Sequence, residues 1–180
     1  PMHSVTDSAE DLAKTRLEDG KVVRWYMDPI FKGRYPQDML EHLGADAPRV
    51  EAGDMQHIAT PMDFLGINYY TRGMISAGEP WDAQRGGRET TDMGWEIYPE
   101  GLTELLLRLH RDYAVPPMYV KENGAAFKDA LSNGRVHDAQ RTQYIANHIA
   151  AVGEALSQGV PMAGYMVWSL LDNFEWASGY

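Results

Sequence analysis

The sequence predicts an α/β protein built on a parallel sheet, because strand-like and helix-like segments alternate along the chain. Residues 63–70, 118–121 and 163–171 are almost continuously apolar, as is typical of strands that are covered on both faces. Between them, residues 99–114 and 138–158 carry apolar side chains at helical spacing. Strand, helix and strand in this order favour right-handed crossovers and parallel pairing of the strands.

Two helices are predicted before the first strand. Ser8 resembles a helix cap, and we expect the helix that follows it to span residues 9–27 and to end before Pro29, because the residue before a proline disfavours helical geometry. The second is a short helix over residues 37–43, with Gly44 as its stop signal.

The helix after residue 137 has the clearest apolar pattern in the chain. Asp138 is expected to cap its start, and Gly159 is expected to lie just past its end. We expect one face of this helix to be apolar, and the residues of that face are Ile145, Ile149, Val152 and Leu156.

The connections between these elements differ in length on the two sides of the predicted sheet. Those that leave the strands are long, at residues 71–98 and 123–137, whereas those that enter the strands are only a few residues long. Long loops at the carboxyl ends of parallel strands are where α/β proteins usually build their sites. We therefore expect the functional residues of this chain at that edge.

The number of predicted strands is small for a closed structure. A (β/α)8 barrel needs ~250 residues, whereas this chain has 180 and stops at Tyr180, soon after its third predicted strand. We therefore expect residues 1–180 to form one partial domain, truncated at both ends, that corresponds to about strands 6 to 8 of a (β/α)8 (TIM) barrel. Its uncovered strand edges would favour self-association of the chain.

Composition and charge exclude several classes of partner. There are 16 Lys and Arg against 26 Asp and Glu, a net charge of −10, and the basic residues do not cluster, so no nucleic acid is expected as a partner. No apolar run approaches the ~20 residues of a membrane span, so no membrane partner is expected either. The chain has no cysteine, no metal-ligand spacing among its six histidines and no glycine-rich phosphate motif, so no metal and no cofactor are expected. The absence of cysteine and of Asn-x-Ser/Thr sites favours a cytoplasmic location.

Polar and aromatic side chains gather where the predicted strands end. If the strands are parallel, these ends meet at one edge of the sheet. Taken singly, each residue could be an ordinary core aromatic or a solvated surface charge, so it is their convergence that indicates a site. The residues are Asn68 and Tyr70 after the first strand, Glu122 after the second, and Trp168, Asp172, Asn173, Glu175 and Trp176 at or after the third.

Carboxylates flanked by Trp and Tyr suit a carbohydrate ligand. A sugar offers hydroxyl groups for charge-assisted hydrogen bonds and an apolar C–H face that stacks on an aromatic ring. Because the sequence has no metal or phosphate-binding motif, hydrolysis of a glycosidic bond by a pair of carboxylates is the simplest chemistry that these residues support.

Four motifs in the chain are long enough to compare with a known family. In chain order they are Asp63-Phe-Leu-Gly-Ile-Asn-Tyr-Tyr70, Gly94-Trp-Glu-Ile-Tyr-Pro-Glu-Gly-Leu102, Tyr119-Val-Lys-Glu-Asn-Gly124 and Gly164-Tyr-Met-Val-Trp-Ser-Leu-Leu-Asp-Asn-Phe-Glu-Trp-Ala-Ser-Gly-Tyr180. Together they resemble successive motifs of glycoside hydrolase family 1, the β-glucosidase family. The likeness runs from about Val5 to Tyr180, and residues 24–36 also resemble the segment before the family's sixth strand.

The resemblance implies a (β/α)8 barrel and a retaining β-glucosidase. Such an enzyme hydrolyses terminal β-D-glucosyl residues of a small β-glucoside or cello-oligosaccharide by double displacement. Glu122 matches the family's nucleophile, and Tyr70 matches the tyrosine that orients this nucleophile through a hydrogen bond. The other matches are to substrate-binding positions: Asn68 near the catalytic pair, Trp168 under the glycone, Glu175 and Trp176 at its distal hydroxyls, and Trp95 on the aglycone side.

The chain departs from the family pattern at two points. The family usually has Thr before its nucleophile, where this chain has Lys121, and alternation along the strand would point Lys121 away from the face of Glu122. The family's acid/base Glu lies in an Asn-Glu-Pro motif after an earlier strand, and no Asn-Glu-Pro occurs in these 180 residues. A retaining site needs two carboxyl groups, so we expect this chain by itself to be inactive.

Two alternatives stay open. Within the same family, the protein could be a 6-phospho-β-glycosidase, a β-galactosidase or a fucosidase, although phosphate-handling members replace the Glu-Trp pair found here at Glu175 and Trp176. In a different functional class, the chain could be a catalytically incompetent part-barrel or a carbohydrate-binding fragment.

Overall fold

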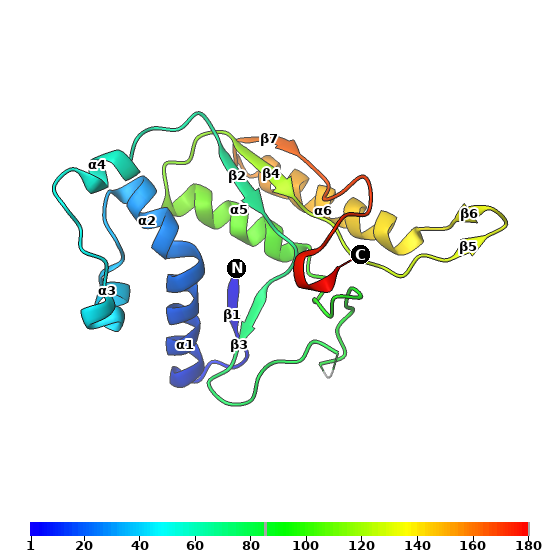
Figure 1. The fold of residues 1–180 in the computed structure, drawn as a ribbon, viewed down its shortest axis with the longest axis horizontal. Helices are drawn as coiled ribbons and strands as arrows, with labels where there is room; N and C mark the ends of the chain where they lie inside the picture. The colour runs from blue at the N-terminus through cyan, green and yellow to red at the C-terminus, as the bar shows by residue number, and fades with distance from the viewer. Residues whose placement is uncertain (85, 180) are drawn as a thin grey trace.

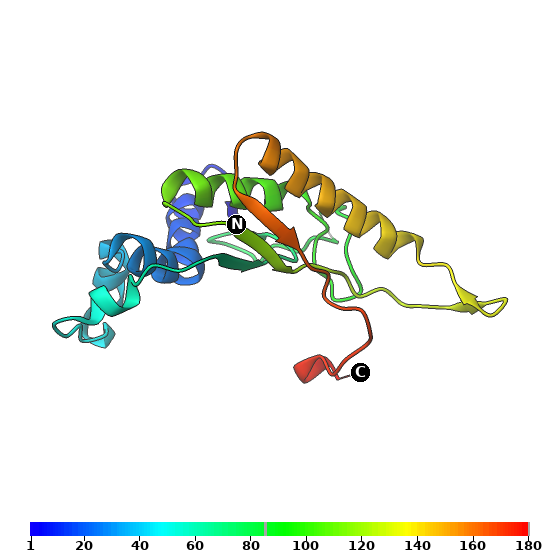
Figure 2. The ribbon, with the colours of Figure 1, turned by 90° about the horizontal axis from the view of Figure 1, so that it is seen from above.

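The computed structural model describes residues 1–84 and 86–179, and its main sheet has three parallel strands in the order β2–β4–β7 (Figure 1). They are β2 (Leu65–Asn68), β4 (Met118–Glu122) and β7 (Met162–Tyr165). Helix α5 (Glu100–Asp112) connects β2 to β4 and helix α6 (Ala139–Ser157) connects β4 to β7, and Figure 2 shows both helices over the same face of the sheet. The predicted α/β class and parallel pairing are confirmed.

The core lies between this sheet and the two helices. Met118 and Val120, alternate residues of β4, have no exposed surface, and they pack in one cluster with the leucines of α5. These leucines recur at helical spacing, so they form a single buried stripe that holds α5 on the sheet. They are Leu102, Leu105, Leu106 and Leu109.

The face of α6 that packs on the sheet is rotated from the predicted one, although Val152 of the predicted face does pack against the core and Ile145 is half-buried. Ile149 and Leu156 are 51% and 54% exposed, and both belong to the predicted apolar face. The observed and predicted faces have the same spacing and differ by one residue, a rotation of about 100° about the helix axis. Two of the buried residues are alanines, which allow α6 to approach α5 closely enough for Thr103 to donate a hydrogen bond to the Ala151 carbonyl at 2.9 Å. The buried residues of α6 are Tyr144, His148, Ala151 and Ala155.

The glycine stop signals are in place at both predicted positions. Gly44 and Gly159 have φ of +53° and +90°, and the short helix α3 (Gln37–Leu43) has the predicted bounds. Asp138 does precede α6, but its carboxylate makes no capping hydrogen bond and pairs instead with Arg141, one turn into the helix.

The first predicted helix continues past its expected end. Helix α1 (Ala9–Asp19) passes through a π-helical turn, η1 (Gly20–Arg24), into α2 (Trp25–Lys32), so that Pro29 lies inside a helix. The predicted end at residue 27 is wrong, because the restriction on the residue before a proline disfavours helical geometry without forbidding it. Gly33, with φ of +64°, ends the helix, and its N–H bonds the Pro29 carbonyl at 3.2 Å.

Several short elements are not evident from the sequence patterns. β1 (Met2–Ser4) pairs in parallel with β3 (Gly73–Ile75), and η2 (Gly44–Asp46) and α4 (Asp54–Ile58) follow α3. β5 (Leu131–Ser132) and β6 (Arg135–Val136) form a hairpin that projects from the body of the molecule in Figures 1 and 2. The turn of this hairpin is Asn133-Gly134, both at positive φ, which is a common hairpin signal.

The third strand is shorter than predicted. β7 ends at Tyr165 rather than near residue 171, and an irregular segment leads from it to the short helix η3 (Trp176–Ser178). Within residues 1–84 and 86–179, no helix has the length and apolar character that crossing a membrane requires.

Candidate active site

The predicted site residues of the first two strands meet at the carboxyl ends of β2 and β4. Asn68 pairs in register with Glu122, because the two parallel strands end together. Tyr70, two residues beyond β2, donates its hydroxyl hydrogen to Glu122 Oε2 at 2.8 Å. The structure therefore joins Tyr70 to Glu122 directly and places the backbone of Asn68 beside them.

Tyr70 is held as a neutral hydrogen-bond donor. Burial, the hydrogen bond to the Glu122 carboxylate and the negative charges of Glu122 and Glu175 all raise the pKa of this phenol. A phenol that keeps its proton at neutral pH always has a donor available for Glu122. Glu175, whose charge contributes to this rise in pKa, lies on the segment after β7.

A bulge in β4 orients Glu122. The register between β2 and β4 shifts so that Lys121 has no partner on β2. Unbroken alternation would put Glu122 on the face of Val120, which is buried under the helices. The stem of Lys121 lies across Gly66, and Glu122 turns towards Tyr70. Lys121 and Glu122 were expected on opposite faces of the sheet because side chains alternate along an unbroken strand. The bulge interrupts this alternation, so that argument does not apply to these two residues.

The two residues after Glu122 fix the turn that follows it. Asn123 is fully buried, and its side-chain amide donates to the Tyr69 carbonyl at 2.7 Å. The Trp168 N–H donates to the Asn123 carbonyl at 2.9 Å. A Cβ on Gly124 would lie 2.0 Å from the Trp168 carbonyl oxygen, so only glycine allows this approach. The segments that follow β2 and β7 are thus both hydrogen-bonded to Asn123, the residue after Glu122.

Trp95 is brought to the pair by the long loop after β2. Its ring centroid lies 5.5 Å from that of Tyr70, and the side chain is 38% exposed. Arg72, near the start of the loop, donates two hydrogen bonds of 2.9 Å to Glu96, the neighbour of Trp95. Both side chains of this ion pair are less than one-tenth exposed, so the pair fixes the two ends of the loop against each other.

The loop after β4 has an anchor of its own. Arg141, in the first turn of α6, donates hydrogen bonds to the carbonyl oxygens of Ala125 and Phe127, both at 3.1 Å. The backbone immediately after Glu122 and its turn is therefore held against α6 before the chain reaches the exposed hairpin.

The residues predicted after the third strand are more exposed. Trp168 and Trp176 are 46% and 82% exposed, and Glu175 is half-buried at the start of η3. Trp168 is linked to the turn after Glu122 through its backbone, and Glu175 acts on Tyr70 through its charge. Among the described residues, Trp176 makes no ring contact with the Tyr70–Glu122 pair.

The sequence model of glycosyl hydrolase family 1 matches residues 2–180. The chain belongs to this family. The predicted family is confirmed, and the three parallel strands are a portion of its (β/α)8 barrel.

Several family 1 proteins that resemble this chain are named β-glucosidase. Beta-glucosidase A of Acetivibrio thermocellus is 41% identical in an alignment 189 positions long, gaps included, that covers 99% of this chain and 42% of that protein. The family 1 β-glucosidase of Exiguobacterium antarcticum B7 superposes with a TM-score of 0.91 at 41% identity, over 100% of this chain and 42% of that one. The β-glucosidase of Thermotoga maritima in complex with glucoimidazole has a TM-score of 0.89 at 38% identity, over 99% and 42% of the two chains. This chain thus spans about 42% of the length of these relatives.

Sequence reasoning missed the residues that support the family site from behind. Asn123 and Glu96 lie inside the motifs quoted above, and their positions beside the predicted site residues Glu122 and Trp95 were the signal that could have identified them. Tyr144 lies on α6, away from the strand ends, and Tyr165 is the last residue of β7; the hydroxyl of a buried tyrosine needs a hydrogen-bond partner. Arg72 was not identified either, because its partner is 24 residues away in the sequence.

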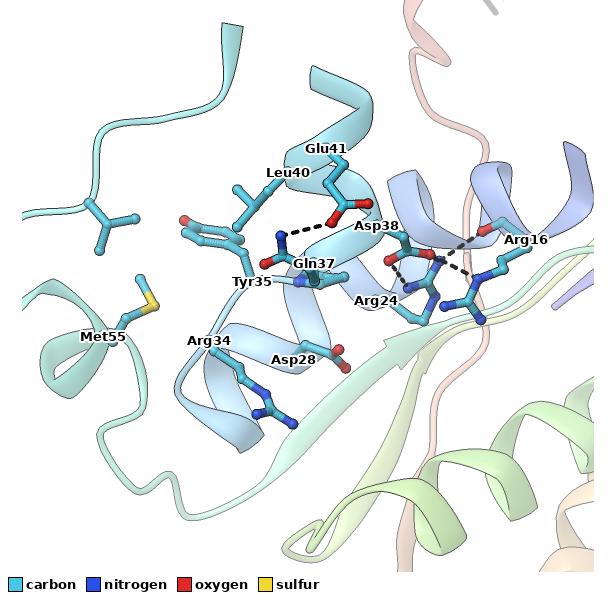
Figure 3. A pocket seen from close by; sticks show the side chains of 12 residues that line it. Arg16, Arg24, Asp28, Arg34, Tyr35, Gln37, Asp38, Leu40, Glu41 and Met55 are labelled. Carbon is cyan, nitrogen blue, oxygen red and sulfur yellow. Dashed lines mark hydrogen bonds and ion pairs between the residues drawn. The ribbon is translucent and has the colours of Figure 1, made fainter. Parts of the chain in front are cut away.

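A hollow of about 770 Å³ lies away from this site, beside α2 and α3 (Figure 3). Arg16 and Arg24 both turn towards Asp38, at 2.9 and 2.8 Å, and Arg24 also pairs with Asp19. None of the predicted site residues lines this hollow. A second hollow of about 330 Å³ runs along β2 and does include Asn68 and Tyr70 in its lining. The predicted site residues therefore lie at the strand ends and not in the larger hollow.

Proposed function

We propose that the full-length protein, meaning the longest natural chain that contains these 180 residues, is a retaining β-glucosidase. The observation that carries the proposal is the Glu122 carboxylate at the end of β4, held at 2.8 Å by the Tyr70 hydroxyl in a family 1 chain. Relatives named β-glucosidase at about 40% identity support glucose as the glycone. The Thermotoga maritima relative in complex with glucoimidazole supports a sugar-shaped ligand.

In this proposal Glu122 is the nucleophile. Its carboxylate attacks the anomeric carbon of a terminal β-D-glucosyl residue, the bond to the leaving oxygen breaks, and that oxygen takes a proton from a carboxylic acid. The resulting carboxylate then deprotonates a water molecule, which attacks the anomeric carbon of the glycosyl-enzyme and releases Glu122. Two inversions leave the product with retained configuration. Tyr70 holds Oε2 in place, which aims Oε1 at the anomeric carbon.

The remaining site residues would bind the sugar. Trp168 offers an exposed ring face on which the glycone can stack, and Glu175 offers a carboxylate for two of its hydroxyls, with Trp176 beside it. Asn68 would bind near the catalytic pair, and Trp95 would contact the aglycone. The negative charge of Glu175 opposes a phosphorylated glycone, which supports a β-glucosidase over a 6-phospho-β-glycosidase.

We further propose that the acid/base carboxyl group is supplied by a part of the full-length protein outside these residues. No Asn-Glu-Pro motif occurs among the 180 residues, and a retaining site needs two carboxyl groups about 5–5.5 Å apart. The isolated chain would then bind sugars without hydrolysing them. That behaviour matches the alternative function, a carbohydrate-binding part-barrel.

Covalent labelling tests the assignment of Glu122. The full-length protein is treated with a 2-deoxy-2-fluoro-β-glucoside that has a good leaving group, and the labelled peptide is identified by mass spectrometry. We expect one label, on Glu122, and neither labelling nor hydrolysis in Glu122→Gln. Glu154→Gln, which removes an exposed carboxylate from α6, is the matched control and should label normally. A label on another residue, or none in an active preparation, would contradict the proposal; sugar binding without labelling or hydrolysis would favour the alternative function.

A further inference from the structure

A buried polar cluster links α6 to the strand ends that carry Tyr70 and Glu122. Tyr144 on α6 and Asn123 after β4 are 2% and 0% exposed. The Tyr144 hydroxyl donates to the Tyr70 carbonyl at 2.9 Å and accepts a hydrogen bond from the Asn123 amide at 3.2 Å. Tyr165, the last residue of β7, donates to Asn123 Oδ1. This one cluster therefore joins α6 to the ends of β2, β4 and β7.

The chemistry of the groups fixes the direction of each bond. The Tyr70 carbonyl can only accept, so Tyr144 donates its proton there and uses a lone pair for Asn123. Asn123 uses both of its N–H groups, one on Tyr144 and one on the Tyr69 carbonyl at 2.7 Å, and its oxygen accepts from Tyr165. Burial raises the pKa of Tyr144, so its hydroxyl keeps the proton that it donates. The orientation of Asn123 is thus fully determined.

The ring and the hydroxyl of Tyr144 have separable roles. The ring stacks on His148 with centroids 4.0 Å apart, a packing role that phenylalanine could also fill. The hydroxyl contacts the backbone that carries Tyr70 and the side chain of the residue that follows Glu122. Without the hydroxyl, the part-buried Tyr70 carbonyl and the buried Asn123 amide would each lose a partner, and the segments that carry them would shift to find another.

We infer that Tyr144 is a positioning residue for the nucleophile: its hydroxyl fixes the Tyr70 backbone and the Asn123 side chain, and through them the place of the Glu122 carboxylate. The inference rests on the proposed function, since it takes Glu122 as the attacking group. Tyr144 is buried behind the strand ends and makes no contact with a sugar there. Its loss therefore slows attack on the anomeric carbon while sugar binding is kept.

The test compares two tyrosines in the full-length protein. For Tyr144→Phe, the maximal rate of labelling by the 2-fluoro-glucoside should fall between about 10- and 100-fold, while its half-saturating concentration and the Kd of a non-covalent sugar analogue stay within about twofold. The matched control is Tyr113→Phe, because Tyr113 is also buried and donates one hydrogen bond, to Asp28 at 2.7 Å, away from the site. This control should label at the wild-type rate.

A double-mutant cycle with Tyr70→Phe tests the route of the effect. If Tyr144 acts by placing Tyr70 and Glu122, its loss costs less in the Tyr70→Phe background than in the wild type, whereas strictly additive losses would overturn the inference. Should Tyr144→Phe fail to fold, Tyr165→Phe removes the other hydroxyl from Asn123 and should give the same split between rate and binding. If the wild type is not labelled at Glu122, the proposed function has failed. If the wild type is labelled and Tyr144→Phe labels at the same rate, only the inference is wrong.

Discussion

Gly124 shows how closely the site depends on single residues. A Cβ at this position would lie 2.0 Å from the Trp168 carbonyl oxygen, so Gly124→Ala must push the third strand end away from the turn after Glu122. We expect a loss of about 1–3 kcal/mol in the free energy of unfolding together with slower hydrolysis of an aryl β-glucoside. Urea unfolding and initial rates on the full-length protein measure the two effects.

The control for this prediction is a second glycine in the chain. Gly153 lies inside α6 with no atom within 4 Å of an added Cβ, so Gly153→Ala should stabilise the protein by about 0.5–1 kcal/mol and leave the hydrolysis rate unchanged. Equal effects from the two substitutions would show that the contact with Trp168 is not what matters at Gly124.

The sequence predicted Tyr70 and Glu122 as neighbours because both follow apolar runs and both lie in family motifs. The structure joins them by a hydrogen bond, and their catalytic roles stay predictions. Tyr144 could not be predicted in the same way, because its contact with the Tyr70 carbonyl spans 74 residues and depends on the rotation of a helix. Periodicity gives the spacing of a helix face but not its direction.

At the scale of elements, Asp19 at the end of α1 connects two helices through charge. Its carboxylate accepts hydrogen bonds from Arg24 at 3.0 Å and from Arg108 of α5, whose NH2 group lies 2.8 Å away. Asp19→Asn leaves two partly buried guanidinium groups without their shared partner, and we expect it to cost about 3 kcal/mol at pH 7. Glu18→Gln breaks an ion pair with the exposed Lys21 on the same helix and should cost less than about 1 kcal/mol.

The pH dependence of this difference follows from the pKa of Asp19. Burial alone would raise that pKa, but the hydrogen bonds and charges of Arg108 and Arg24 outweigh burial and lower it. The stabilisation is therefore present above the unfolded pKa of about 3.9 and is lost as the pH falls further, through the folded pKa. The difference between the urea midpoints of wild type and Asp19→Asn should narrow as the pH falls below about 4; a difference that stays constant from pH 7 down to the lowest pH at which both proteins fold would argue against the charged pair as its source.

Helix boundaries were predictable where a single residue sets them, and not where several interactions compete. Gly44 and Gly159 stop their helices by conformation alone, as the sequence indicates. Pro29 does not stop its helix, because the π-helical turn before it and the packing of α2 outweigh the local preference. The predicted face of α6 was wrong in part: Val152 packs against the core, but Ala151 and Ala155 take the most buried positions, while Ile149 and Leu156 are about half exposed.

At the scale of the whole molecule, loop lengths predicted the edge of the sheet at which Tyr70, Trp95 and Glu122 meet. The long connections after β2 and β4 bring Trp95 to Tyr70 and hold the turn after Glu122, and the short connections lie at the opposite edge. The hairpin β5–β6 and the pairing of β1 with β3 were beyond prediction from periodicity, because strands of two or three residues are too short to show a period.

The open edge of the sheet makes a prediction about the isolated 180-residue chain. In the described part of the chain, β2 pairs within the main sheet only with β4, and the hollow along β2 is lined mostly by apolar residues, with Val22 and Tyr26 54% and 62% exposed at its rim. Unpaired strand edges and exposed apolar patches promote association.

We expect the isolated chain to sediment as concentration-dependent oligomers and to hydrolyse no aryl β-glucoside. Val22→Lys should weaken the association, whereas Leu131→Lys, on the exposed hairpin, should not. A monomer at every concentration, or turnover at the rate of the full-length protein, would contradict this view of the chain as an incomplete barrel.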